Sequence, residues 1–388
     1  MKIGILTYFW DENHGTILQA HFLWKALSDF FPNAHVELIN YRHARNIQIV
    51  KNYFKYKDVF YDFKKKVVTD KFKKNNLELS RKSLISKDYK KAIQFIDTGQ
   101  YDVVVVGSDT VWQLTSNKRL PRFPNAYWLP GAIKSKKIAF AVSSNITRYE
   151  DISEEHRIIM RKALNDFSFI GVRDTMTLDL ANSLGIEEGS KLFRVFDPTF
   201  LVDPPDTNIK ELLVNKGVKF DKPILGINYP PAAPFCSRIV EMYKSLGYQI
   251  VTFISRLNSA DHKLVCLTPF EWASAYQYFD FVITDRFHGT IFSLKNQVPV
   301  LAIDWHPFRY DKSGNSKTRC LMRDFGIEKT NHINAKLMEG GFDFFIDKAE
   351  EARRSFNKEK IKTKVNEIRQ DCFGYLGKIR SLILDEMS

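Results

Sequence analysis

The chain has 388 residues, which is enough for two domains of ordinary size. Its hydrophobic fraction of 44% supports a sizeable buried core and excludes a wholly disordered protein. The sequence has no apolar run of transmembrane length, and its first residues lack the long apolar region of a secretory signal. The cysteines match neither a zinc pattern nor a dense disulfide framework, and this favours a reducing, cytoplasmic setting.

The formal net charge is +13. Most of the positive excess lies in residues 51–91, which contain 14 Lys and Arg but only five Asp and Glu. Aromatic residues alternate with these lysines, which suits an anionic membrane surface or a nucleic acid. Because no RNA- or DNA-binding signature accompanies the block, nucleic acid is disfavoured as a partner. The remaining alternatives are a peripheral membrane contact, which we prefer, and a solvated helical face that packs its aromatic residues on the first domain.

The first half of the chain alternates predicted strands and helices. Strands are expected at Lys2–Thr7, Val36–Ile39, Asp102–Val106, Lys137–Val142 and Phe169–Val172. Helices are expected after Gly15, over Ser153–Phe167, and from the cap at Asp174 to Gly185. This alternation is typical of a parallel sheet with crossover helices.

A Pro- and Asp-rich segment, Asp197–Asn208, is the predicted linker. Beyond it, strands are expected at Pro223–Ile227, Gln249–Ile254, Lys263–Leu267, Phe279–Thr284 and Val298–Ile303, with helices at 235–246 and after the capping box at Thr268–Glu271. The predicted fold class is α/β, with two Rossmann-like doubly wound domains and C-terminal helices. The first expected domain is 1–200, which includes the basic insertion 51–91, and the second is 209–345. Helices are expected over 346–388, and one possibility is that they pack back on the first domain.

In doubly wound sheets, ligands bind beyond the carboxyl ends of the strands, so residues that follow strands are site candidates. The densest such cluster is Asp285–Gly289 (DRFHG). His288 suits proton transfer near neutral pH, and Arg286 with the amide of Gly289 suits an anion at a helix start. The alternative is a structural turn with a satisfied histidine.

Three other strand ends carry candidate residues in the first half. Arg173 either binds an anion or pairs with Asp174. In Gly107–Ser108–Asp109, the carboxylate either serves as a base or caps a turn. Asn13–His14–Gly15 either faces a ligand or caps a helix. Dinucleotide, Walker, zinc-protease and serine-hydrolase motifs are absent from the sequence, and no metal site can be argued from spacing.

A set of segments in this order resembles the polysaccharide pyruvyl transferases over about residues 1–330. These segments are GILTYFWDENHGTILQAHFL, YDVVVVGSDTVWQ, KKIAFAVSS, GVRD, DPTFLV and TDRFHGTIFSLKNQVPV. The resemblance implies a GT-B-like fold with two facing Rossmann-like domains. It also implies transfer of pyruvate from phosphoenolpyruvate onto two hydroxyls of a sugar, with a cyclic ketal formed and phosphate released.

The resemblance and the chemistry of the residues together give expected roles for residues of this chain. His288 is expected as the acid and Asp109 as a base or orienting group. The expected donor-binding residues are Arg173, Arg286, Gly289, Lys317 and Arg319. The expected acceptor-binding residues are Asn13, His14, Gly15, Gln19, Ser108, Trp112 and Ser143. Phosphoenolpyruvate is a co-substrate, no cofactor or metal is expected, and the expected acceptor is a sugar of a surface polysaccharide or its precursor linked to polyprenyl diphosphate.

Two other functions remain open at this stage. A nucleotide-sugar glycosyltransferase of the same architecture would need a slot for base and ribose, for which Thr268–Trp272 is a candidate. A non-catalytic polyanion-binding protein would use residues 51–91. The expected location is the cytoplasm, with peripheral contact at the inner membrane face as an additional hypothesis.

Overall fold

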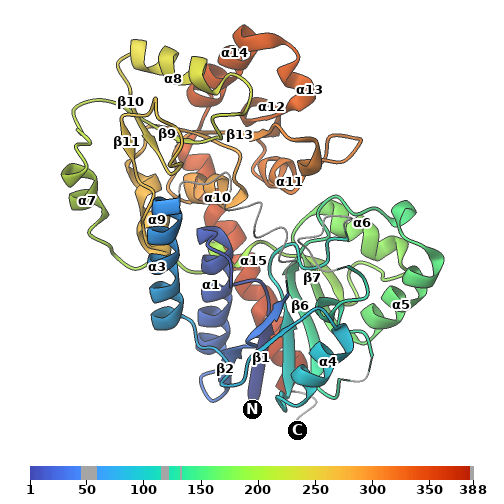
Figure 1. Ribbon diagram of the computed structural model, residues 1–388. Coiled ribbons are helices and arrows are strands. Elements are labelled where there is room, and N and C mark those ends of the chain that lie inside the picture. The colour runs from blue at the N-terminus through green and yellow to red at the C-terminus, as the bar shows by residue number, and fades with distance from the viewer. Residues whose placement is uncertain (45–58, 115–121, 132, 385–388) are drawn as a thin grey trace. The chain divides into compact units, whose positions relative to one another are not determined.

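The computed structural model describes residues 1–44, 59–114, 122–131 and 133–384 (Figure 1). Contacts divide the chain into two units, each of which contains its own parallel sheet. Unit 1 comprises Met1–Lys57, Phe72–Val202 and Ile368–Ser388. Unit 2 comprises Asp58–Lys71 and Asp203–Glu367.

Unit 1 is built around a six-stranded sheet whose neighbouring strands are all parallel. In spatial order the strands are β2 (His35–Leu38), β1 (Lys2–Leu6), β5 (Val103–Val106), β6 (Lys136–Val142), β7 (Phe167–Val172) and β8 (Leu192–Arg194). A separate parallel pair joins β3 (Tyr41–His43) to β4 (Leu84–Ser86). All four valines of β5 are buried, as expected for a central strand covered on both faces.

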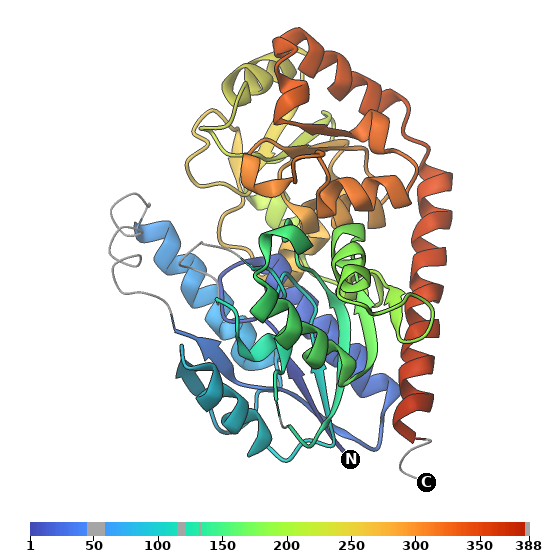
Figure 2. The same ribbon diagram turned by 90° about the vertical axis from the view of Figure 1, so that its right-hand side faces the viewer.

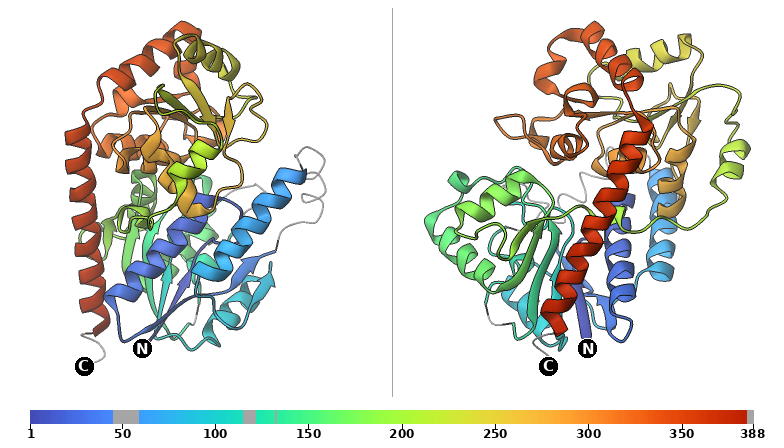
Figure 3. Two further views of the ribbon diagram at one scale, coloured as in Figure 1. Left: turned by 90° about the vertical axis from the view of Figure 1, so that its left-hand side faces the viewer. Right: turned by 180° about the vertical axis from the view of Figure 1, so that it is seen from behind.

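Helices cover both faces of the unit 1 sheet (Figures 2 and 3). One face carries α4 (Tyr89–Asp97), α5 (Glu154–Asn165) and α6 (Thr175–Ser183), whose apolar residues share a core with β5 and β7. The other face carries α1 (His14–Phe30) and the last part of α15 (Lys358–Leu384), where the rings of Phe30 and Phe373 stack. The end of α3 (Val59–Asn76) packs beside α1, with His21 Nδ1 2.7 Å from the Asn76 carbonyl.

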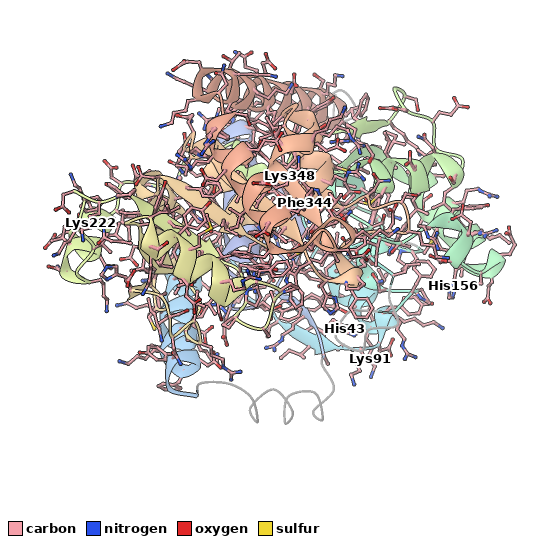
Figure 4. All side chains as sticks on the ribbon, turned by 90° about the horizontal axis from the view of Figure 1, so that it is seen from above. His43, Lys91, His156, Lys222, Phe344 and Lys348 are labelled. Atoms are coloured by element: carbon pink, nitrogen blue, oxygen red, sulfur yellow. The ribbon has the colours of Figure 1, made fainter. Side chains whose placement is uncertain are left out.

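Unit 2 is built around a second parallel six-stranded sheet. Its strands in spatial order are β11 (His262–Lys263), β10 (Gln249–Thr252), β9 (Ile224–Asn228), β12 (Phe281–Thr284), β13 (Val300–Asp304) and β14 (His332–Asn334). Its helices are the first part of α3, α7 (Ile209–Asn215), α8 (Cys236–Ser245), α9 (Pro269–Ala275), α10 (Phe287–Lys295), α11 (Lys317–Asp324), α12 (Glu328–Asn331), α13 (Ala335–Met338), α14 (Gly341–Arg354) and the first part of α15. Figure 4 shows Phe344 and Lys348 extending from α14.

Each sheet reverses its strand order at one place, and ligands of doubly wound folds bind at such a place. In unit 1, β1 lies between β2 and β5, so the chain reverses direction across the sheet between β1 and β5. In unit 2 the same reversal lies between β9 and β12. The segments that follow these four strands therefore start at the two positions where this fold places its ligands.

The predicted α/β class with parallel sheets is confirmed, and most elements form within a few residues of their expected bounds. The predicted strand Lys263–Leu267 is wrong beyond Lys263, because Thr268 caps α9 immediately afterwards and the chain leaves the sheet edge. The sequence analysis missed β14, whose three residues are too few to produce a recognisable alternation. Among the described residues, no helix has the length and apolarity needed to cross a bilayer.

Candidate active site

In unit 2, the turn between β12 and α10 carries the DRFHG cluster at the point of strand-order reversal. Arg286 is the N-cap residue of α10, and its amide donates to Thr284 Oγ1 at 3.0 Å. The Arg286 side chain does not cap the helix; it is half-exposed, and its Nε lies 3.0 Å from Asp285 Oδ1. The helix start and the guanidinium thus present positive charge at the same turn, which suits an anion.

Asp285 is the buried carboxylate that holds this turn to the segment after β13. Its Oδ2 accepts from Trp305 Nε1 at 3.1 Å and from Arg309 Nη2 at 2.9 Å. Arg309 Nη1 also donates to the Asp285 carbonyl at 2.5 Å. One carboxylate therefore anchors two arginines, Arg286 and Arg309, beside the start of α10.

Arg309 was given no role from the sequence, although it lies in the short segment that follows β13. Its contact with Asp285 joins residues 24 positions apart in the chain. A spacing argument cannot find such a contact, because it depends on β12 and β13 being neighbours in the sheet.

His288 and Gly289 lie in the first turn of α10, and both are buried. A Cβ atom at Gly289 would lie 2.8 Å from Thr284 Oγ1 and 2.9 Å from the Tyr276 hydroxyl oxygen. Glycine is therefore required for close packing of this turn on its neighbours, rather than for an unusual backbone angle. Burial raises the pKa of the Tyr276 hydroxyl above its ordinary value, so the phenol stays neutral at physiological pH.

Lys317 and Arg319, predicted to close the donor site, both lie in the first turn of α11. Lys317 Nζ lies 5.3 Å from the centre of the Phe287 ring, next to the DRFHG turn. The Arg319 side chain instead forms structural hydrogen bonds. Its Nε donates to Glu328 Oε1 at 2.8 Å, and its Nη1 donates to the Gly314 carbonyl at 3.2 Å. The structure thus brings Lys317 near the turn, whereas Arg319 ties α11 to α12.

In unit 1, Asp109 follows β5 at the corresponding reversal of strand order. Its Oδ1 accepts from its neighbour's amide, Thr110 N, at 2.7 Å, and its Oδ2 accepts from Thr16 Oγ1 at 3.2 Å. The backbone of Asp109 has a φ of +86°, a conformation that non-glycine residues rarely adopt. The Asp109 side chain keeps 11% of its surface exposed, whereas the Arg173 side chain that pairs with it keeps 1%.

Arg173, which follows β7, is almost completely buried and pairs with two carboxylates. Its Nη1 lies 2.7 Å from Asp197 Oδ2, and its Nη2 lies 3.4 Å from Asp109 Oδ1. The sequence analysis considered Asp174 as the partner, but Asp174 caps α6 by accepting from Thr177 N. Arg173 therefore links Asp109 to Asp197, a residue that the sequence analysis had placed in the linker.

Gln19 and Ser108 are wholly buried and join the ends of β1 and β5. Gln19 Nε2 donates to the Tyr8 carbonyl at 2.9 Å and to Thr7 Oγ1 at 3.1 Å, and the Ser108 hydroxyl donates to Gln19 Oε1. Thr7 Oγ1 in turn donates to the Ser108 carbonyl at 2.9 Å. This network holds the peptide next to Asp109 in place, and its members have no surface to offer an acceptor in this conformation.

The other predicted acceptor residues divide into helix-start residues and core residues. Asn13 is exposed and caps α1 by accepting from Gly15 N at 3.1 Å, while His14 and Gly15 are buried in the first turn. Trp112 is buried, and its indole donates to the Tyr127 carbonyl at 2.9 Å. Ser143 is buried as well, and its amide donates to the Asp109 carbonyl at 2.9 Å.

An aromatic cluster that the sequence analysis did not select lies beside Asp109. The Tyr8 ring packs on Tyr127 at 4.9 Å and on Trp10 at 6.0 Å, and Arg42 lies 5.0 Å from the Trp10 ring. Burial and the Asp109 charge raise the pKa of Tyr8 well above its ordinary value, which keeps this phenol neutral. Tyr8 and Trp10 lie in the strand-following segment Tyr8–Gly15, so their position made them candidates, but no motif gave either residue a role.

Within the described parts of the chain, no group of three or more His, Cys, Asp and Glu side chains is arranged to hold a metal ion. The two strand-reversal sites contain cationic groups, helix starts, the buried histidines His14 and His288, and the partly exposed carboxylate of Asp109. These groups can bind anions and transfer protons.

Comparison with known proteins identifies both the fold and the family. The chain is similar in fold to the UDP-GlcNAc 2-epimerase from Methanocaldococcus jannaschii, with 15% identity, 95% of this chain and 93% of that chain covered, and a TM-score of 0.50. It is also similar to the glycotransferase of kitacinnamycin, with 12% identity, 100% and 98% covered, and a TM-score of 0.51. These likenesses confirm the GT-B-like class. No curated protein was matched.

The family model described as polysaccharide pyruvyl transferase matches residues 13–307, which is most of the sequence. This range contains the segments after β5, β7, β9 and β12, together with Asp109, Arg173 and the DRFHG turn. The resemblance inferred from the sequence motifs is therefore confirmed, and the chain belongs to the polysaccharide pyruvyl transferase family.

Proposed function

We propose that this transferase moves pyruvate from phosphoenolpyruvate onto two hydroxyls of a sugar in a surface polysaccharide or its polyprenyl-diphosphate-linked precursor. The observation that carries the proposal is the β12–α10 turn, where Asp285 holds Arg286 and Arg309 beside the start of the helix that contains the buried His288. Phosphoenolpyruvate has a phosphate and a carboxylate, and these groups call for cations and backbone donors of this kind.

In the proposed reaction, His288 in its protonated form donates a proton to C3 of the enol, and C2 becomes electrophilic. One sugar hydroxyl adds its oxygen to C2, and its proton restores the acid through a base or solvent. The C2–O bond to phosphate then breaks, and inorganic phosphate departs with the bonding electrons. The second hydroxyl attacks C2, its proton is released, and the cyclic ketal is complete.

Asp109 is our candidate for the group that orients or deprotonates the acceptor. Its two oxygens are fixed by Thr110 N and Thr16 Oγ1, and part of its surface remains accessible. Arg173 pairs with this carboxylate, and a carboxylate is a group that can accept the proton of a hydroxyl. In this proposal, Arg173 holds the carboxylates of Asp109 and Asp197 in place. Binding of the donor by Arg173 stays a prediction.

A nucleotide-sugar glycosyltransferase has less support from the side chains. Glu271, in the segment considered for a base and ribose slot, caps its own helix by accepting from Thr268 N at 2.7 Å. Trp272 is buried against Tyr276 and Phe292. Both residues thus have structural roles that account for their presence.

The reaction is tested by incubating the protein with phosphoenolpyruvate and either a nitrophenyl sugar or a polyprenyl-diphosphate-linked sugar. Mass spectrometry should detect a product heavier by one ketal-linked pyruvate, and inorganic phosphate should appear in equal amount. Calorimetric titration with phosphoenolpyruvate and with a panel of sugar nucleotides provides the comparison. Binding of a sugar nucleotide without binding of phosphoenolpyruvate would reject the proposed donor.

A further inference from the structure

Helix α3 carries apolar side chains on two opposite faces, which is unusual for a helix at a protein surface. On one face, Phe72 is 5% exposed and Thr69 is completely buried. On the other face, Phe63 is 67% exposed and Val67, one turn later, is 50% exposed. The buried face accounts for the packing of α3 on the rest of the protein. The exposed Phe63 and Val67 take no part in that packing and need a separate explanation.

The exposed pair is surrounded by lysines on the same outward face. Helical spacing places Lys66, Lys71 and Lys74 around Phe63 and Val67, and all three lysines are exposed. Only Asp70 opposes them there, and it forms an ion pair with Lys66. The outward face, defined here as Phe63, Lys66, Val67, Lys71 and Lys74, is therefore cationic with an apolar centre.

A second basic segment of unit 2 lies close to the first half of α3. Burial raises the pKa of the Cys266 thiol, and the positive charges of Lys64 and Lys65 of α3 and of Lys216 at the end of α7 act against that shift. The segment after α7 also exposes Phe220 and ends at the exposed Lys222, which Figure 4 shows at the surface. The positive charge of α3 is thus extended by residues about 150 positions later in the chain.

We propose that the outward face of α3 is a docking surface for an anionic phospholipid membrane. An interfacial helix inserts aromatic and aliphatic side chains among the head groups while its lysines contact the lipid phosphates. Phe63 and Val67 provide the inserted part, and Lys66, Lys71 and Lys74 provide the charge. The exposure of Phe63 supports the membrane alternative at this position, because a face that packs its aromatic residues inward would bury it, as it buries Phe72.

The proposed function supplies a purpose for this contact, because a lipid-linked acceptor lies at a membrane. The docking itself is independent of catalysis, so it is measured by binding alone. The full-length protein is sedimented with vesicles of phosphatidylcholine, with or without phosphatidylglycerol. We expect binding to the anionic vesicles, weakening as salt is raised, and little binding to the neutral ones.

Two matched pairs of variants locate the surface. Lys66→Glu/Lys71→Glu/Lys74→Glu should weaken binding to anionic vesicles by at least about tenfold, because each lysine near a membrane contributes about fivefold. The control Lys358→Glu/Lys360→Glu/Lys362→Glu makes the same change of charge on α15 and should bind within about twofold of the wild type. Phe63→Ser should weaken binding severalfold, whereas Ile158→Ser, at another exposed apolar position, in α5, should not.

Circular dichroism and thermal unfolding verify that each variant is folded. Pyruvyl transfer to a soluble nitrophenyl sugar should be unchanged in Phe63→Ser, which separates failure of docking from failure of the proposed function. The proposal is overturned if the wild type ignores anionic vesicles, or if each variant binds like its control. It is also overturned if the protein binds single-stranded RNA in a salt-sensitive manner and does not bind vesicles.

Discussion

Arg173 Nη1 lies 2.7 Å from Asp197 Oδ2, and both side chains are 1% exposed. This ion pair fastens the end of β7 to the short helical turn at Pro198–Phe200, where the chain leaves the sheet of unit 1. The same guanidinium reaches Asp109 Oδ1, so the position of the candidate base depends on a buried charge network. Stability and activity are therefore expected to be coupled at Arg173.

Replacing Arg173 with Ala should destabilise unit 1, because it leaves the Asp197 carboxylate buried without its partner. Loss of one member of a buried pair costs about 3–5 kcal/mol. Thermal unfolding should show a lower midpoint, and Arg173→Met/Asp197→Asn should recover part of the loss. Calorimetry on the folded variant then tests donor binding, and an unchanged dissociation constant for phosphoenolpyruvate would assign Arg173 to positioning alone.

Replacing His288 with Ala should reduce turnover by ~10²-fold or more, the usual loss when an acid–base group is removed. The measurement is phosphate release from phosphoenolpyruvate in the presence of acceptor. His156→Ala, at a partly exposed histidine of α5, is the matched control and should retain full activity (Figure 4). Near-normal phosphate release by His288→Ala would remove this residue from the mechanism.

Replacing Asp285 with Asn should weaken donor binding more than it slows turnover. The amide loses the charge that holds Arg286 and Arg309, and a charge-assisted hydrogen bond contributes about 1.5–3 kcal/mol, or roughly tenfold or more in affinity. Arg309→Ala should shift the KM for phosphoenolpyruvate in the same direction. An unchanged KM in both variants, with both proteins folded, would show that the Asp285 network has no part in donor binding.

Glu328 should contribute stability that depends on pH. Hydrogen bonds from Arg323 and then Arg319 lower the pKa of this carboxyl below its ordinary value of 4.5. Its contribution is therefore complete above about pH 4.5 and is lost as the pH falls through the lower pKa of the folded state.

Glu328→Gln should accordingly lower the free energy of unfolding by about 1 kcal/mol at neutral pH, because the pair is partly solvated. Near pH 3 the difference should be smaller, since the wild-type carboxyl is then largely protonated in the unfolded state. Urea unfolding at the two pH values provides the comparison. Steady-state kinetics of the same variant address Arg319: a raised KM for phosphoenolpyruvate would support its predicted donor role, and an unchanged one would limit it to structure.

Replacing Gly289 with Ala should disturb the first turn of α10, because the new methyl group would meet Thr284 and Tyr276 at less than 3 Å. We expect lower activity and a lower unfolding temperature. Gly374→Ala is the matched control, since a Cβ there meets no atom within 4 Å, and it should stabilise α15 by about 0.5–1 kcal/mol. Full activity in Gly289→Ala would show that close packing of this turn is dispensable.

Local features of the site could be predicted from the sequence because they depend on neighbouring residues. The DRFHG turn follows a recognisable apolar strand and begins a helix, and the Thr268 capping box is a short-range pattern that forms as expected. The Pro- and Asp-rich segment from Asp197 was interpreted less well. Its composition is typical of a linker, yet Asp197 is buried. Composition could not indicate this, because the arginine that pairs with Asp197 lies 24 residues earlier in the chain.

The sequence alone determined the α/β class and the strand ends at which chemistry is expected, through its alternation of predicted strands and helices, and the family resemblance, through the order of its motifs. The tertiary structure decided which of those residues have accessible surface: Gln19, Ser108 and Trp112 are internal, whereas Asp109 and Arg286 remain reachable. It also divided the aromatic residues of α3, burying Phe72 and exposing Phe63. The physical reason is that charge and periodicity are properties of the chain, whereas burial and pairing depend on which strands and helices become neighbours.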